Sequence, residues 1–199
     1  MAADERVDAI AGLIGELDLH CTLHHERVDT SVHARLEAEA LGAVSAFTYA
    51  GSGLRMVQSR RQARSAPEVV AVAVQGRRPG VLLQHQRQRM LQPGELFLID
   101  HTSAYDYQWH GDGGATSLGI PLDALGLPVE LVRRAGHQLA ASPLRDLVTD
   151  HVQRVNADVT RLGSDAGSPA LGRATLELVR ALVLTAASTR STDENADAP

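Results

Sequence analysis

Short apolar runs recur about every ten residues between residues 41 and 120, and this repeat limits the fold more than any other feature. Turn sequences that contain Gly or Pro, such as Gly51-Ser52-Gly53 and Pro93-Gly94, separate the runs. Strands of this length and spacing are typical of a β-sandwich or β-barrel. The sequence therefore predicts about eight strands, at residues 43–50, 54–59, 69–75, 80–84, 87–91, 95–100, 104–109 and 115–120.

Helical spacing of apolar residues flanks this β region on both sides. It predicts an amphipathic helix over residues 4–19, and an arm or loop without a clear period follows at 20–40. After Pro121 the pattern is helical again: a short helix opens at Pro128 and ends at Gly136, and two longer helices follow over residues 143–162 and 169–187. Each longer helix starts with Ser-Pro, a favourable N-cap followed by a residue that suits the first helical turn.

The predicted fold is mainly β with C-terminal α structure, in which a β-barrel or double sheet precedes an antiparallel helix pair. We divide the chain into four regions: an N-terminal helix and arm (residues 1–40), a sensor barrel (41–120), a helical region (121–188) and a linker or disordered tail (189–199). The tail contains no apolar residue larger than Ala, so it has little to bury in a core.

The last helix carries apolar residues on two sides, so it needs two partners. Leu171, Leu178 and Leu182 form one stripe, which can face the barrel or the preceding helix. The other stripe consists of Leu176, Val179 and Val183. We predict that this second stripe forms a homodimer interface.

Composition excludes several classes of protein. The formal net charge is −5, and the one basic stretch, residues 54–92 with eight Arg, is too little to predict specific DNA binding by this chain. No apolar run is long enough for a transmembrane helix, and the acidic N-terminus does not resemble a secretory signal. Cys21 is the only cysteine, which fits a reducing compartment, so we expect a cytoplasmic location.

Residues 80–105, GVLLQHQRQRMLQPGELFLIDHTSAY, contain a specific string. It resembles the N-terminal regulatory domain of the AraC/XylS family of transcriptional regulators, and the resemblance extends over about residues 36–188. The matching positions that we interpret as structural are Gln84, Arg87, Pro93, Gly94, Glu95 and Asp100. The family pattern often has Gly, Pro and Arg where this chain has Gln86, Ala104 and Leu122, which weakens the transfer of residue roles near the barrel mouth.

The resemblance implies a cupin-like barrel that binds a small-molecule effector, a homodimer, and no catalytic residues. It also implies that DNA is bound by helix-turn-helix units that follow the linker and are absent from residues 1–199. Two explanations stay open: a regulator reduced to its sensor half, or a stand-alone sensor. We expect Arg87 to be a structural ion-pair donor to an acid such as Glu95 rather than a ligand contact.

One strand concentrates half of the six aromatic residues of the chain. Side chains alternate along a strand, so Tyr105, Tyr107 and Trp109 share one face. They either fill the core or line a pocket, and the small residues expected opposite them, Ala71, Ala73 and Gly119, leave room for a pocket. The candidate pocket residues are Tyr105, Tyr107, Trp109, Met56 and Phe97.

Other chemistries lack their residues. His20, Cys21, His24 and His25 could suggest zinc, but neighbours in an extended arm point apart. The alternative of a cupin-like metal-dependent enzyme lacks closely spaced His residues on the inward strands. No Gly-x-Ser-x-Gly motif occurs. We therefore predict no metal, no cofactor and no catalytic residue. The predicted function is that of a sensing and dimerisation domain. The other alternative is a pure oligomerisation module whose barrel is filled.

Overall fold

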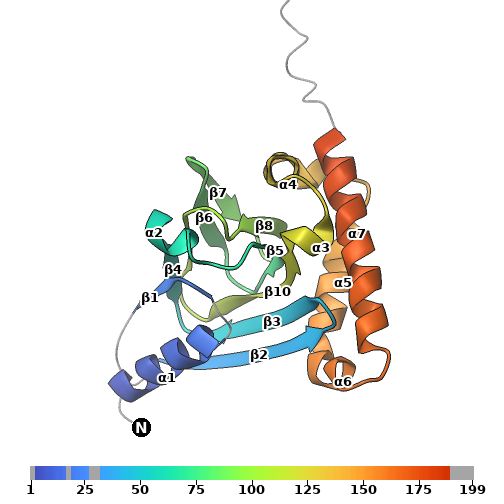
Figure 1. Ribbon diagram of the computed structural model, residues 1–199. Helices are drawn as coiled ribbons and strands as arrows, with labels where there is room; N and C mark the ends of the chain where they lie inside the picture. Colours follow the sequence, from blue (N-terminus) through green and yellow to red (C-terminus); the bar gives the residue numbers. More distant parts are fainter. Residues whose placement is uncertain (1–2, 17–18, 27–31, 189–199) are drawn as a thin grey trace, which may run out of the picture.

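In the computed structural model, two antiparallel five-stranded sheets face each other and a group of helices covers one of them (Figure 1). The structure describes residues 3–16, 19–26 and 32–188. The first sheet has the strand order β1 (Thr22–His25), β4 (Leu54–Gln58), β9 (Tyr105–Trp109), β6 (Gly80–Gln84) and β7 (Arg87–Leu91). The second has the order β2 (Ala34–Leu41), β3 (Val44–Gly51), β10 (Gly113–Pro121), β5 (Val69–Gln75) and β8 (Leu96–Asp100).

The helices divide into two groups. The first contains α1 (Ala3–Glu16), which packs Ile10 and Ile14 into the core between the sheets, and the single turn α2 (Arg60–Ala63). The second group lies beside the β2–β3–β10–β5–β8 sheet (Figure 1) and contains α3 (Leu122–Leu125), α4 (Val129–Gly136), the 3-10 turn η1 (Leu139–Ala141), α5 (Arg145–Ala157), α6 (Val159–Gly163) and α7 (Ser168–Ser188). None of the described helices is long and apolar enough to cross a membrane.

The predicted cupin-like double sheet is confirmed, and the eight predicted strands correspond to β3 through β10 within one or two residues. The predicted arm was wrong in part, because it contains β1 and β2, which complete the two sheets. The predicted helix over 143–162 is two helices, because Asp158 leaves the helical backbone conformation at φ −117° and ψ 22°. The first helix begins within one residue of its predicted start and extends to Glu16. Residues 17–18 of its predicted end lie outside the described residues, and so does the predicted tail at residues 189–199.

The second sheet separates two hydrophobic cores. Strand β5 shows the division, because Val70, Val72 and Val74 pack toward the helices while Ala73 packs toward the first sheet. Alternation along the strand sends successive side chains to opposite faces. The core on the helical side is made of aliphatic residues, and the core between the sheets contains the aromatic ones.

Helix α7 corrects the predicted dimer interface. Leu176, Val179 and Val183 are 8%, 0% and 0% exposed, so they belong to the helical core of the same protomer. The helix needs two partners, as predicted, but both are found within the chain: α7 packs on β2 and β3 as well as on α3, α4 and α5. Any contact between copies has to use other residues.

A candidate ligand cavity between the sheets

A cavity of about 180 Å³ lies between the two sheets. All five candidate pocket residues predicted from the sequence line it: Met56 of β4, Tyr105, Tyr107 and Trp109 of β9, and Phe97 of β8. The first four come from one sheet, and Phe97 comes from the other. The alternation of β9 therefore brings its three aromatic rings to the inner face of the double sheet.

The opposite sheet lines the cavity with several small side chains, which leave the hollow, and with the larger residues Phe47, Tyr49, Phe97 and Ile99. Ala71, Ala73 and Gly119 line the cavity from β5 and β10, where the register pairs Ala71 with Gly119. A Cβ at Gly119 would lie 2.4 Å from Ser45 Oγ, so the absence of a side chain there keeps the wall open. Large rings that face residues with little or no side chain cannot fill the space between them.

Ring contacts fix the aromatic wall. The ring of Tyr107 lies 5.3 Å from that of Phe97 and 5.4 Å from that of Trp109, between centroids. Tyr107 donates its hydroxyl hydrogen bond to Gln75 Oε1 at 2.7 Å, and Gln75 Nε2 donates to the carbonyl oxygen of Arg78 at 2.7 Å. Burial raises the pKa of Tyr107 above its ordinary value, so the phenol stays a hydrogen-bond donor.

Two buried donors of residues that line the cavity, one from each sheet, have no hydrogen-bond partner within the described residues. They are Tyr49 Oη and Trp109 Nε1, and their two rings meet edge-on at 5.3 Å. Burial raises the pKa of Tyr49 to about 12, so its hydroxyl is protonated at neutral pH. An unsatisfied buried donor costs about 1–3 kcal/mol, and such groups are rare in native structures.

His101 and Tyr105 line the other end of the cavity. Their rings are 5.3 Å apart, and burial lowers the pKa of His101 to about 4, with Asp100 opposing that shift in part. The imidazole is therefore neutral at pH 7. Tyr105 hydrogen-bonds the Cys21 thiol, whose pKa burial raises to about 11, so Cys21 is not an activated nucleophile.

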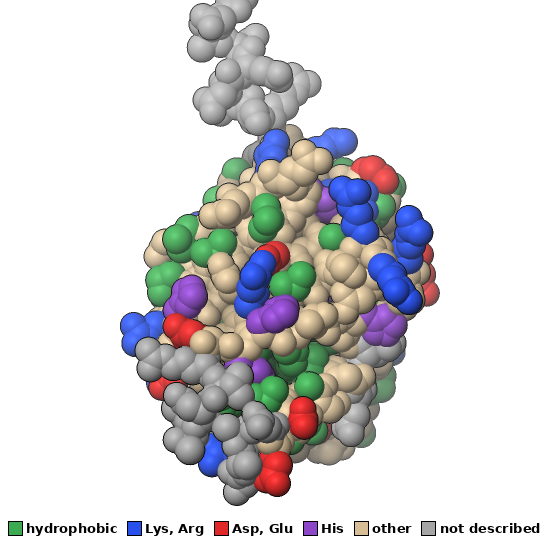
Figure 2. Space-filling view, turned by 90° about the vertical axis from the view of Figure 1, so that its left-hand side faces the viewer, with side chains coloured by type: hydrophobic (Ala, Val, Ile, Leu, Met, Phe, Trp, Pro, Cys, Tyr) green, Lys and Arg blue, Asp and Glu red, His purple; other side chains and the backbone are tan. Residues whose placement is uncertain are grey.

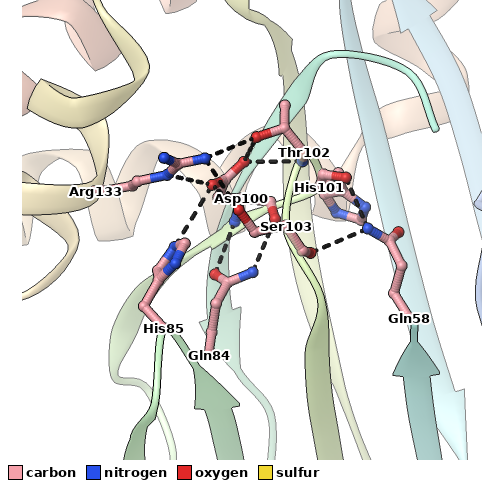
Figure 3. A network of polar contacts seen from close by, with 8 residues as sticks. All are labelled: Gln58, Gln84, His85, Asp100, His101, Thr102, Ser103 and Arg133. Carbon is pink, nitrogen blue, oxygen red and sulfur yellow. Dashed lines mark hydrogen bonds and ion pairs between the residues drawn. The ribbon is translucent and has the colours of Figure 1, made fainter. Parts of the chain in front are cut away.

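A polar network begins at the residue before His101 (Figure 3). The Asp100 carboxylate accepts hydrogen bonds from Arg133 Nε of α4 at 2.8 Å, from the Thr102 backbone N–H at 2.8 Å and from Ser103 Oγ at 2.9 Å. His85 Nε2 lies 3.5 Å from the same carboxylate. Burial opposes ionisation of Asp100, but the hydrogen bonds from Thr102, Arg133 and Ser103 outweigh it, so the pKa lies below the ordinary value.

Two glutamine side chains hold the backbone of this turn. Gln84 donates to the carbonyl oxygen of Asp100 at 2.8 Å and accepts from its N–H at 3.0 Å. Gln58 donates to the carbonyl oxygens of His101 and Ser103 at 2.7 and 3.1 Å. Residues 100–103 are thus fixed from β4, β6 and α4, with the His101 ring on the cavity side and the Asp100 carboxylate bonded to α4 (Figure 3).

The predicted ion pair between Arg87 and Glu95 is wrong. Glu95 pairs instead with Arg89, with 2.9 Å between the Oε1 and Nη2 atoms, and Arg89 also donates to the carbonyl oxygen of Gly136 at the end of α4. The turn at Pro93-Gly94 folds the chain back after β7, so Glu95 meets the nearer of the two arginines. Gly94 has a φ of 79°, which glycine adopts without strain.

Most arginines of the basic stretch, residues 54–92, lie on the surface. Arg60, Arg61 and Arg64 in and after α2 are exposed, and Arg side chains lie close together on the upper right of the face in Figure 2. Arg55, whose side chain is exposed, forms an ion pair with Asp106. None of these residues is part of the described cavity lining.

Metal-ligating residues do not converge within the described parts of the chain, where no group of three or more His, Cys, Asp or Glu residues could hold an ion. His24 and His25 are neighbours on β1, where alternation directs them to opposite faces.

Comparison with known proteins gives the family. The model of the AraC-binding-like domain matches residues 8–184. The chain belongs to the AraC-binding-like domain family. The protein is therefore an AraC-family N-terminal binding domain, which is a regulatory ligand-binding domain. The resemblance of residues 80–105 to this family is thus confirmed. No curated protein matches the sequence.

Among solved structures, the crystal structure of the AraC-like transcriptional activator CuxR is similar in fold. The TM-score is 0.71 at 15% identity, and the match covers 93% of this chain and 68% of that one. The double sheet and the helical layer are therefore shared with an AraC-like activator.

Tyr49 and His101 are among the lining residues that the sequence did not predict. Tyr49 lies on β3, two residues after Phe47, and this alternation was a weak signal of an inward face. His101 follows the end of β8, where no strand period could predict its direction.

Proposed function

We propose that this AraC-binding-like domain senses a small-molecule effector in the cavity between the sheets and thereby controls a DNA-binding part of a transcription regulator. The observation that carries the proposal is the cavity itself. It has a volume of about 180 Å³, it lies between the aromatic residues of β9 and a sheet with several small side chains, and two residues of its lining carry unpartnered donors. A pocket of mainly apolar lining with a few polar groups is the usual form of a small-molecule site.

Transmission from the cavity begins at the turn of residues 100–103. A ligand that contacts the His101 ring displaces or fixes a turn whose Asp100 carboxylate is bonded to Arg133 of α4. Helix α4 in turn packs on α7, the last described element of the chain. An effector acts by binding one arrangement of these elements more tightly than another.

The proposal includes a homodimer and a cytoplasmic location, with DNA contacted through another part of the regulator. Leu147 of α5 and Leu184 of α7 are large apolar side chains of the helical layer that are 56% and 44% exposed. They are the residues of this layer that a second copy would cover.

A panel of compounds from different classes tests effector sensing: glucose, succinate, AMP, spermidine and acetophenone. We expect at least one of them to raise the melting temperature of the chain, because a ligand that binds only the folded state stabilises it. Ala71→Leu, which fills the cavity, should abolish the shift, and Ala50→Leu, on an exposed position of β3, should not.

The same panel distinguishes the alternatives. A pure oligomerisation module would show no shift with any compound. A cupin-like metal-dependent enzyme would contain stoichiometric iron, manganese or zinc in an elemental analysis. Either result would contradict effector sensing by this cavity.

A further inference from the structure

The charge of the cavity lining restricts what it can hold. None of its described lining residues is Asp, Glu, Arg or Lys, and its titratable side chains are His101 and three tyrosines. The imidazole is neutral at pH 7, and burial keeps the phenols protonated. An ionised ligand would lose its hydration without meeting an opposite charge, which is costly in an apolar interior.

The size and shape of the cavity restrict the ligand further. An apolar cavity of about 150 Å³ holds one benzene molecule, so about 180 Å³ suits one ring with a small substituent. Tyr107 and Trp109 of one sheet and Phe97 of the other offer ring faces and edges, and the small side chains of Ala71 and Ala73, in the strand next to Phe97, leave a slot between the sheets. Offset and edge-to-face contacts with such rings favour a planar aromatic or unsaturated ligand.

The register of the strands places the unpartnered donors at one end of this slot. Strand β9 runs from Tyr105, at the His101 end of the cavity, to Trp109 at the opposite end. In β3, Tyr49 pairs with Ala115 of β10. This pair is four residues along β10 from the pair that Ser45 forms with Gly119. Tyr49 and Trp109 therefore form the end remote from His101, where their rings are in contact. The polar atoms of both are donors at neutral pH, so the matching ligand group is an acceptor oxygen.

We propose that the cavity takes a neutral, single-ring ligand that carries one hydrogen-bond acceptor, such as a carbonyl oxygen, which is seated against Tyr49 and Trp109. The ligand class rests on the proposed effector site. Sugars, dicarboxylates and nucleotides are excluded by the same features: they need many polar partners or a charge of opposite sign, and the described lining supplies neither.

Three probes of matched size test the class: acetophenone, ethylbenzene and benzoate. Acetophenone has the ring and the acceptor, ethylbenzene has the ring without the acceptor, and benzoate carries a charge. Calorimetric titration at pH 7 should show the order of affinity acetophenone, then ethylbenzene, with no binding of benzoate. The loss of one hydrogen bond is expected to weaken ethylbenzene roughly tenfold relative to acetophenone.

Tyr49→Phe tests the position of the acceptor. This variant removes a hydroxyl that has no partner in the described structure, so the fold should be retained, with the melting temperature as the check. The Kd of acetophenone should rise toward that of ethylbenzene, because one of the two donors is lost, while the Kd of ethylbenzene stays constant. Ala50→Leu serves as the variant outside the cavity, and all three affinities should match those of the unmodified chain.

The results that would contradict the expected order separate the proposed ligand class from the proposed effector sensing. Benzoate binding as tightly as acetophenone, or an unchanged acetophenone Kd in Tyr49→Phe, overturns the ligand class. If neither neutral probe binds but glucose, succinate, AMP or spermidine stabilises the chain, the class falls and effector sensing stands. If no compound of either set binds, the class and the proposed function fall together.

Discussion

His101 is the residue at which the cavity and the polar network meet. Its ring lines the cavity beside Tyr105, its carbonyl oxygen accepts from Gln58, and its neighbour Asp100 is bonded to α4. Burial removes the imidazole from water, and the attraction of Asp100 offsets this only in part, so the pKa falls to about 4. The residue therefore links ligand contact, turn geometry and pH.

The first prediction concerns the pH dependence of folding. The pKa of His101 is about 4 in the folded state and about 6.5 when unfolded, so the unfolded state binds more protons between these values. The contribution of His101 to stability is thus lost as pH falls from 6.5 toward 4, with a slope of up to about 1.4 kcal/mol per pH unit. In His101→Phe the measured slope should become shallower by this contribution. Urea unfolding at several pH values measures it.

An exposed histidine provides the control for that measurement. His24 lies on the exposed side of β1, so His24→Gln should leave the slope as it is in the unmodified chain. Stability curves of His101→Phe and the unmodified chain that run parallel between pH 4 and 6.5 would show that the imidazole is accessible to protons in the folded state.

At this scale the sequence predicts what alternation determines and little more. The inward face of Tyr105, Tyr107 and Trp109 follows from the period of one strand, and the structure places all three around the cavity. The partner of Glu95 depends on how a turn closes, so Arg89 was missed in favour of Arg87. Tyr49 and His101 reach the cavity only because the two sheets face each other, which is a non-local fact.

Among the secondary-structure elements, α7 shows how closely the helical layer approaches the sheets. A Cβ at Gly172 would lie 1.8 Å from the carbonyl oxygen of Leu41, at the end of β2. Because that neighbour is backbone, it cannot move aside as a flexible side chain would. The contact sets the position of the first half of α7.

The second prediction compares two helical glycines. Gly172→Ala should lower the free energy of unfolding by about 1–3 kcal/mol, because the methyl group overpacks the contact with Leu41. Gly12→Ala in α1 meets nothing within 4 Å and should raise it by up to about 1 kcal/mol through helix propensity. Chemical denaturation of both variants measures the difference, and equal effects would contradict the close approach.

The third prediction separates the core face of α7 from its surface. Leu176→Ala should cost about 2–4 kcal/mol of stability, because the side chain is buried within the protomer. Leu184→Ala, at a position exposed in the single protomer, should change the stability of that protomer by no more than about 0.5 kcal/mol. Sedimentation of the two variants completes the test: a change of mass in Leu176→Ala without a loss of stability would restore that residue to an interface between copies.

The elements that the sequence missed share a physical cause. Strand β2 reads ARLEAEAL, in which Ala and Glu supply little β propensity, and only Leu41 is fully buried. It is held by pairing with β3 over eight residues, a tertiary contact that overrides local preference. By contrast, strands with Val, Leu and aromatic residues between Gly and Pro turns were predictable, because their local signals agree with the fold.

On the scale of the whole molecule, the second sheet has a cavity on one face and a packed helical layer on the other. The aromatic core on the cavity side is incompletely filled, whereas the aliphatic core on the helical side contains the long helix α7. The turn at residues 100–103 and Arg89 connect the β structure with α4 by hydrogen bonds. A change in the cavity therefore has a defined polar route to the helices.

The last prediction tests this route by amide hydrogen exchange with acetophenone as the ligand. Binding should slow exchange in the cavity strands and also in α4, because a fixed His101 holds the turn that Arg133 contacts. Arg133→Met removes the bonds from α4 to Asp100, Thr102 and Ser103, so protection should remain in the strands and be lost in α4. Arg55→Met breaks an exposed ion pair with Asp106 and should leave both responses intact. If α4 is protected as strongly in Arg133→Met as in the unmodified chain, the packed sheet and not the polar turn carries the signal. If protection in the unmodified chain is confined to the strands, binding in the cavity does not affect the helical layer.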